Sequence, residues 1–148
     1  MSIIAVKSNV EASIDQVWNV ISNFEQPHRY HPYIIKTQLL SDQKQGIGAK
    51  RRCDMNDNTF VVEEVIEWIE KERITVDETH FHAVSQSRVS FGLNKLTAST
   101  SAVTIRMDYV RKPGFLGWLE EQITVKIFMK RVFKRIIKNI GEIIHNSS

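Results

Sequence analysis

The sequence predicts an α+β protein in which a curved, seven-stranded antiparallel sheet wraps around one long C-terminal helix. Pro113 is the last proline, and from Phe128 to Ile144 apolar residues recur at the three-and-four spacing of one helix face. A helix from Phe115 to Ile144 would be about 45 Å long. Upstream, short runs of alternating polarity separated by turn residues predict strands. The apolar face of so long a helix needs a large partner, and these strands supply a sheet.

The elements before the helix follow from local sequence chemistry. Residues 2–10 alternate loosely and predict the first strand. The run Ala12-Ser13-Ile14-Asp15 offers capping chemistry for a short helix through Val17, Trp18, Val20 and Ile21. Pro27 suits the first turn of a second short helical piece, and Pro32 ends it. Six more strands are expected at residues 34–41, 48–55, 59–69, 72–80, 86–95 and 101–111, with turn residues between them.

Length and composition favour one globular domain that spans residues 1–148. The chain has 42% hydrophobic and 25% charged residues, as is usual for such a domain. Its one cysteine, Cys53, excludes an intrachain disulfide framework and a zinc site built mainly from thiolates, and we expect it to be a small core residue. Because the sequence shows neither a signal-peptide pattern nor a run of about 18 apolar residues, we expect a cytoplasmic protein.

The net charge of +3 is concentrated on the predicted C-terminal helix. Between Lys112 and His145, seven Lys and Arg residues stand against three acidic residues. This pattern usually marks a solvated outer face, but it leaves open peripheral contact with an anionic membrane or an acidic partner, whereas nucleic acid is not expected. Phe115, Leu116 and Trp118 precede the basic stretch. Exposed, they would suit a bilayer interface, but we expect them to be buried as a cap under the sheet.

Alternation along the strands assigns side chains to the interior. Within residues 59–69 the bulkier alternate set is assigned to the helix side: Phe60, Val62, Glu64, Ile66 and Trp68. The same alternation assigns a second set of residues to the interior: Val89, Phe91, Leu93, Val103, Ile105, Met107 and Tyr109. In the strand that starts at Glu72, the inward phase continues past Val76 to Glu78, His80 and His82. These last three residues would form a polar cluster at one end of an apolar chamber.

The order of elements, together with four local motifs, resembles the START-like or SRPBCC superfamily and its polyketide cyclase/dehydrase group. The motifs are an opening helix over Ala12 to Phe24, the step His31-Pro32-Tyr33 into the second strand, the pair Gly46 and Gly48, and the Glu-bearing strand from Val62 to Trp68. The likeness covers nearly the whole chain. It implies a helix-grip fold around an apolar cavity for lipids, sterols, quinones or polyketides. It implies no one activity, because binding proteins and enzymes share the scaffold.

Glu64 is the first candidate for chemistry. A carboxyl group in an apolar chamber would have a raised pKa and would serve as a general acid or base, or orient a ligand. The structural alternative is an ion pair with Arg52 or Arg73. His80 and Tyr109 are the candidate proton donors.

Two pairs of histidines have the spacing of metal ligands. His80 and His82 would share one strand face with Glu64 or Glu78, and His28 and His31 are three residues apart. Solvent contact is the better interpretation of both pairs. We therefore expect neither a metal site nor a cofactor.

We expect the protein to bind a hydrophobic or amphipathic small molecule between the sheet and the C-terminal helix. The expected ligand-binding residues are Glu64, Trp68, Phe91, Met107, Tyr109, Phe128, Val132 and Ile136. One alternative is a polyketide cyclase or dehydratase with Glu64 as base and Tyr109 or His80 as donor. Another is a membrane-facing lipid or quinone chaperone that uses the basic helix face. The sequence is compatible with a monomer or a homodimer and does not specify the ligand.

Overall fold

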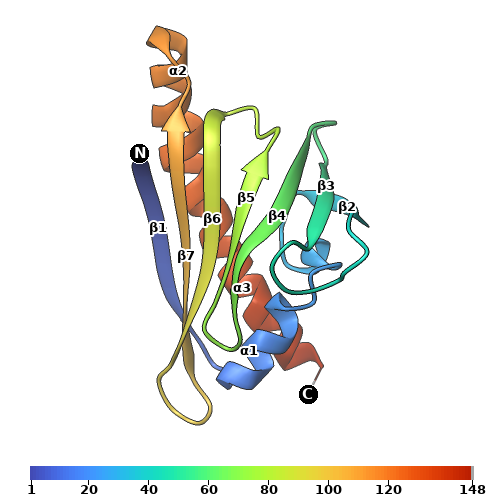
Figure 1. Cartoon of the computed structure of the whole chain (residues 1–148). Helices are drawn as coiled ribbons and strands as arrows, with labels where there is room; N and C mark the ends of the chain where they lie inside the picture. Colours follow the sequence, from blue (N-terminus) through green and yellow to red (C-terminus); the bar gives the residue numbers. More distant parts are fainter. Residues whose placement is uncertain (148) are drawn as a thin grey trace.

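The computed structural model describes residues 1–147, and its seven strands form one antiparallel sheet in the order β1-β7-β6-β5-β4-β3-β2 (Figure 1). The strands are β1 Ser2–Val10, β2 Ile34–Leu39, β3 Lys50–Met55, β4 Phe60–Ile69, β5 Arg73–Thr79, β6 Val84–Lys95 and β7 Ser101–Arg111. Two short helical elements, α1 Ile14–Ile21 and η1 Pro27–Arg29, follow β1. This architecture confirms the helix-grip α+β fold predicted from the sequence.

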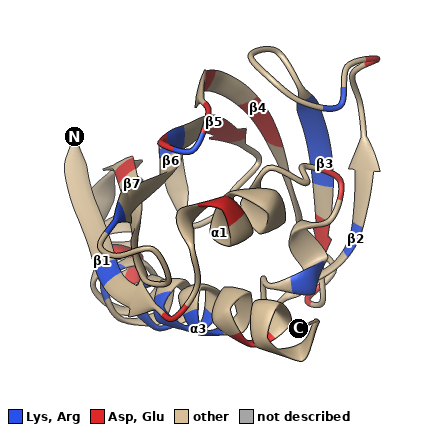
Figure 2. Ribbon diagram, turned by 90° about the horizontal axis from the view of Figure 1, so that it is seen from below, with Lys and Arg blue, Asp and Glu red and all other residues tan. Residues whose placement is uncertain are grey.

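The long C-terminal helix runs without a break from Gly114 to Asn146 and has three parts. They are α2 Gly114–Glu120, the π-helical segment η2 Glu121–Met129, and α3 Lys130–Asn146. The sheet curls around α1, and α3 lies across the side left open between the edge strands β1 and β2 (Figure 2). At its other end the helix extends past the strands, so that α2 projects from the molecule (Figure 1).

The core lies between the sheet and α3. The apolar face predicted from the three-and-four spacing is buried along α3: Val132, Phe133, Ile136, Ile137, Ile140 and Ile144. It packs against inward side chains of β1, β6 and β7, among which Val103, Ile105 and Met107 have no exposed surface. These side chains form the core between the sheet and the helix.

Local chemistry positions the short helices as predicted. Ser13 caps α1, because its Oγ accepts a hydrogen bond from the Gln16 amide at 3.2 Å while its own amide donates to Gln16 Oε1 at 3.0 Å. η1 begins at Pro27. The Asn139 side chain of α3 donates to the carbonyl of Tyr30 at 2.9 Å, which ties the end of η1 to the long helix.

A bulge in β4 divides that strand into two phases. The pairing of β4 with β5 shifts between Val65 and Glu67, and Ile66 has no partner in the ladder. Downstream of the bulge Trp68 faces the interior, where its ring lies 5.4 Å from that of Trp18.

Upstream of the bulge the inward residues are Val61, Glu63 and Val65, all buried, while Glu64 is exposed. The prediction of an inward Glu64 was therefore wrong. It extended the phase of bulky Trp68 along the whole strand, and the extra residue at the bulge reverses that phase.

The predicted cap under the sheet is also wrong. Phe115, Leu116 and Trp118 are 71%, 79% and 46% exposed. They lie on α2, which projects beyond the strands (Figure 1), so the sheet does not reach them. Among residues 1–147 no helix is long and apolar enough to cross a membrane.

Candidate functional site

An apolar pocket of about 510 Å³ lies between the long helix and strands β3, β4 and β5. Its lining residues are His31, Tyr33, Met55, Asn56, Asp57, Thr59, Val61, Glu78, Phe81, His82, Ile123, Thr124, Phe128, Met129 and Val132. The helix contributes residues of η2 and the first turn of α3. The ring of Phe128 stacks on that of Tyr33, with 5.4 Å between centroids. π-Helical turns such as η2 are rare and are frequently found at functional sites.

A buried ion pair lies behind the polar side of this pocket. Arg51 of β3 donates a hydrogen bond from Nε to Glu63 Oε1 at 2.8 Å, and a second guanidinium nitrogen lies 2.7 Å from the same oxygen. A third nitrogen donates to the carbonyl of Phe24 at 2.8 Å, and the guanidinium lies 4.0 Å from the centre of the Phe24 ring. Because its guanidinium group already contacts Glu63 and Phe24, Arg51 is not available as a counter-ion for a ligand.

Glu78 lies next to this pair and also lines the pocket. Burial, the charge of Glu63 and a hydrogen bond with Glu63 raise the pKa of Glu78 well above its ordinary value. Burial opposes the ionisation of Glu63 too, and it is the largest single effect, but the charge of Arg51 together with hydrogen bonds from Glu78 and Arg51 holds the pKa of Glu63 below its ordinary value. Ser87 Oγ donates to Glu78 Oε1 at 2.5 Å. Of this pair Glu63 therefore ionises first, and Glu78 holds its proton to a higher pH than an ordinary carboxyl group does.

His31 supplies a second polar group to the pocket. Burial lowers the pKa of His31 to about 4, so the ring is neutral at pH 7. Its Nδ1 accepts a hydrogen bond from the Tyr33 amide at 3.1 Å. The proton of the neutral ring is therefore on Nε2, which makes that atom a hydrogen-bond donor. The sequence predicted a solvent-exposed loop at His31, and the half-buried ring beside the pocket corrects this.

The sequence matches the family model described as polyketide cyclase / dehydrase and lipid transport over residues 1–142. The chain belongs to this family. No match was found among curated protein sequences.

Three solved structures show that the fold of the family is shared at low sequence identity. XoxI from Bacillus cereus is 15% identical and has a TM-score of 0.79, with 98% of this chain and 96% of that chain covered. A START superfamily protein from Mycobacterium smegmatis is 14% identical, with a TM-score of 0.80 and 99% of both chains covered. A point mutant of norcoclaurine synthase from Thalictrum, in complex with a transition-state analogue, is 13% identical, with a TM-score of 0.75 and coverage of 99% and 95%.

Two of the eight predicted ligand-binding residues, Phe128 and Val132, line the apolar pocket of this family member. The others lie elsewhere. Trp68 and Phe91 pack inside, against Trp18 and Tyr30 respectively.

Met107, Tyr109 and Ile136 belong to the filled core. Tyr109 donates to Glu121 Oε2 at 2.8 Å, and burial together with this bond raises its pKa to about 12. Tyr109 does not line the apolar pocket, and its catalytic role stays a prediction.

The two remaining catalytic candidates point away from the pocket. Glu64 is exposed on β4, as described above. His80 is exposed in the turn after β5, where its φ of 69° ends the strand, and its Nδ1 lies 3.1 Å from the Thr79 hydroxyl. Among residues 1–147 no group of three His, Cys, Asp or Glu side chains is arranged to hold a metal ion.

The polar residues that do reach the pocket were only partly visible in the sequence. Glu78 was predicted to face inward because it continues the phase of Ile74 and Val76, and it does. Glu63 was missed because alternation from Trp68 assigns it to the outer face, and the bulge at Ile66 turns it inward. Cys53 is buried as expected, and burial beside Glu63, whose Oε1 is 3.7 Å from the sulfur, raises its pKa.

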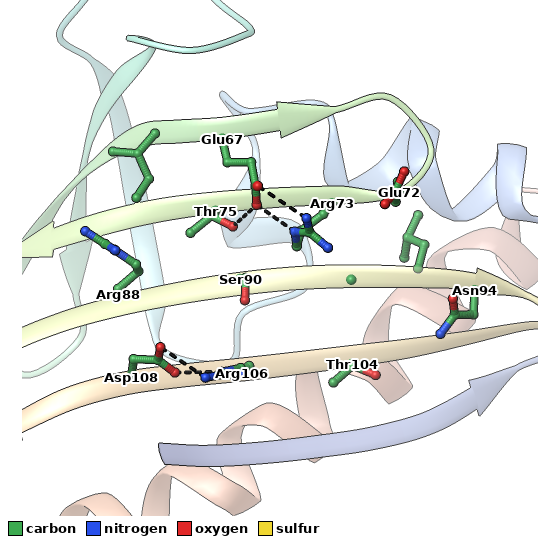
Figure 3. Close-up of a pocket in the computed structure, with 13 residues that line it drawn as sticks. Glu67, Glu72, Arg73, Thr75, Arg88, Ser90, Asn94, Thr104, Arg106 and Asp108 are labelled. Carbon is green, nitrogen blue, oxygen red and sulfur yellow. Dashed lines mark hydrogen bonds and ion pairs between the residues drawn. The ribbon is translucent and has the colours of Figure 1, made fainter. Parts of the chain in front are cut away.

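A second hollow of about 620 Å³, the outer groove, lies on the opposite face of the sheet (Figure 3). Its charged residues pair with one another: Arg73 of β5 binds Glu67 of β4 at 2.6 Å, and Arg106 binds Asp108 of the same strand, β7, at 2.7 Å. Gly92 also lines this groove. These residues are half exposed and already paired, so the apolar pocket is the better candidate site.

Proposed function

We propose that the protein binds a hydrophobic or amphipathic small molecule in the apolar pocket. The observation that carries this proposal is an apolar space of about 510 Å³ bordered on one side by groups that hold protons, Glu78 and His31. Ligand pockets of proteins commonly measure about 300–1,000 Å³ and combine apolar walls with a few polar groups. Val61, Phe128 and Met129 supply apolar wall, which gives affinity through burial.

The charges around the pocket favour an uncharged polar group on the ligand. Arg51 already pairs with Glu63, so a ligand carboxylate would find no free counter-ion there. Glu78 holds its proton to a higher pH than an ordinary carboxyl group, and Asp57 at the rim of the pocket already accepts hydrogen bonds from the Thr59 amide and hydroxyl, so neither favours a ligand cation. A carbonyl or hydroxyl oxygen suits the Nε2–H of His31. Quinones, polyketides and other neutral oxygenated apolar molecules have these groups.

Titration with the neutral fluorescent probe N-phenyl-1-naphthylamine tests this proposal. Thr124→Trp places an indole in the pocket from the helix side, and Thr104→Trp places the same side chain in the outer groove. We expect the first substitution to weaken probe binding by about tenfold or more and the second by less than about twofold. Equal effects of the two substitutions, or a larger effect of Thr104→Trp, would contradict the proposal.

A second candidate function is acid–base catalysis, favoured by the raised pKa of Glu78 beside the pocket. In the dehydration of a β-hydroxycarbonyl substrate, the Glu78 carboxyl group would protonate the departing hydroxyl, which leaves as water. The carboxylate would then take up the proton of the neighbouring carbon as the double bond forms. This role replaces the one that the sequence suggested for Glu64.

Glu78→Gln separates the two functions. Gln retains hydrogen bonds to Ser87 and Glu63 but cannot cycle a proton. An enzyme would lose turnover of a β-hydroxycarbonyl compound, followed by mass spectrometry as the loss of water, while probe affinity stays within about tenfold. If neither protein dehydrates such compounds, binding without catalysis is the function.

A further inference from the structure

The projecting end of the long helix carries a group of exposed apolar side chains. We call this group the docking surface: Phe115, Leu116, Trp118 and Leu119 of α2 with Ile123 and Ile127 of η2. Their exposed fractions run from 38% to 79%. Scattered single apolar residues are normal on a protein surface, but contiguous ones on one projection mark an interaction site.

The docking surface has a fixed shape. Gly117 is buried where α2 turns back on the end of β7, and a Cβ there would lie 2.0 Å from the carbonyl oxygen of Lys112. The rings of Phe115 and Trp118 stack, with centroids 5.9 Å apart. The aromatic side chains are therefore presented on an anchored helix.

Positive charge follows the docking surface along the same helix. Residues 122–141 contain six Lys and Arg and neither Asp nor Glu. Lys126, Lys130 and Lys134 are exposed, and the blue segments of α3 in Figure 2 mark its basic residues. The nearby acids are engaged: Glu121 accepts the Tyr109 hydroxyl, and Glu120 lies 3.7 Å from the Lys112 ammonium.

We propose that the docking surface binds an anionic lipid bilayer. Aromatic and aliphatic side chains next to lysines are the combination that suits a membrane interface, because the apolar groups enter the acyl boundary while the cations meet lipid phosphates. A second copy of the chain fits less well. It would bring two basic helices together, and residues 122–141 have no acid to neutralise them.

Docking would also place the apolar pocket next to the bilayer. Ile123 belongs to the docking surface and lines the pocket, and Phe128 beside it is 42% exposed. This step rests on the proposed function, since it names the bilayer as the source of the ligand. Binding to the bilayer itself does not depend on what the pocket holds.

Co-sedimentation with lipid vesicles tests the proposal. We expect the wild-type protein to sediment with phosphatidylcholine vesicles that contain phosphatidylglycerol, less with phosphatidylcholine alone, and less as salt rises. The double substitution Leu116→Ser/Trp118→Ser should lower the partition coefficient by about tenfold or more. Lys130→Gln should lower it by about fivefold on the anionic vesicles only. The matched control is Ile35→Ser/Ile47→Ser, which removes two side chains 65% and 66% exposed elsewhere and should change nothing.

Three results would overturn docking. They are failure of the wild-type protein to sediment with anionic vesicles, equal sedimentation of the double variant, and a wild-type dimer in analytical ultracentrifugation that the double variant breaks. The last result would make a second copy the occupant. Affinity for the fluorescent probe, measured without vesicles, distinguishes membrane docking from ligand binding in the pocket. Leu116→Ser/Trp118→Ser changes no residue that lines the pocket, so the probe affinity of this variant should stay unchanged.

Discussion

At the scale of single residues, the site depends on the unequal ionisation of two neighbouring glutamates. Of the two glutamates, Arg51 forms a hydrogen bond and an ion pair with Glu63. Glu63 is therefore ionised in a buried place, and its charge helps to keep Glu78 protonated. A carboxylic acid kept neutral beside an apolar pocket costs stability near neutral pH, which points to a functional use.

Glu78→Gln should change how stability depends on pH. The raised pKa of Glu78 means that the folded protein keeps a proton that the unfolded chain releases above the ordinary value of 4.5. The contribution of Glu78 to the free energy of unfolding is therefore fully present below that pH. It declines as the pH rises towards the pKa of Glu78 in the folded protein, by at most about 1.4 kcal/mol per pH unit. We expect the Tm of Glu78→Gln, relative to wild type, to rise from pH 5 to pH 8. The control Glu64→Gln, at an exposed position, should show no such trend, and a constant Tm difference for Glu78→Gln would refute the ionisation states assigned here.

Removing Arg51 should be strongly destabilising unless Glu63 is neutralised as well. Arg51→Met leaves Glu63 buried without its counter-ion, and we expect a loss of about 3–5 kcal/mol in urea unfolding. The double variant Arg51→Met/Glu63→Gln should recover a large part of that loss. If Arg51→Met alone costs less than about 1 kcal/mol, the two side chains do not act as a buried pair.

At the scale of elements, the bulge in β4 sets the limit of what the sequence can predict. Alternation correctly placed Glu78 in β5, where the phase runs without interruption past Ile74 and Val76. In β4 the same rule failed, because one extra residue at Ile66 gives opposite phases to Glu64 and Trp68. A bulge without a glycine leaves no local sequence signal, so Glu63 could be found only from the register of the strands.

The projection of α2 follows from the close approach of Gly117 to Lys112. Gly117→Ala brings a methyl group into the Lys112 backbone and should cost about 1–3 kcal/mol or displace α2. Gly141→Ala is the matched control in α3, where a Cβ would lie 3.4 Å from a Val10 methyl group. It should be neutral or stabilise by up to about 1 kcal/mol, since alanine favours a helix. Similar urea-unfolding free energies for the two variants would contradict the packing described for α2.

At the scale of the whole molecule, the order of elements was predictable and the position of the cavity was not. The turn residues, the cap at Ser13 and the helical spacing after Pro113 each act locally, so they can be read from sequence. A cavity is the volume that side chains fail to fill, and this depends on all of them together. Met107 and Tyr109, which the sequence placed beside the chamber, are buried in the core, and the apolar pocket lies by η2.

The exposure of Phe115, Leu116 and Trp118 could not be predicted from sequence for the same reason. Apolar residues at the start of a helix are usually buried, and only the length of the neighbouring strands shows that nothing covers these. The basic stretch after them was visible at once and kept membrane contact open as an alternative.

The most direct test of the central claim is to locate a bound apolar molecule on the protein. We would record ¹H–¹⁵N spectra of the wild-type protein during titration with N-phenyl-1-naphthylamine. The amides of Val61, Glu78, Thr124 and Met129, which surround the apolar pocket, should show the largest shifts. Largest shifts at Ser90 and Thr104 of the outer groove, or no localised shifts at all, would contradict the assignment of the site.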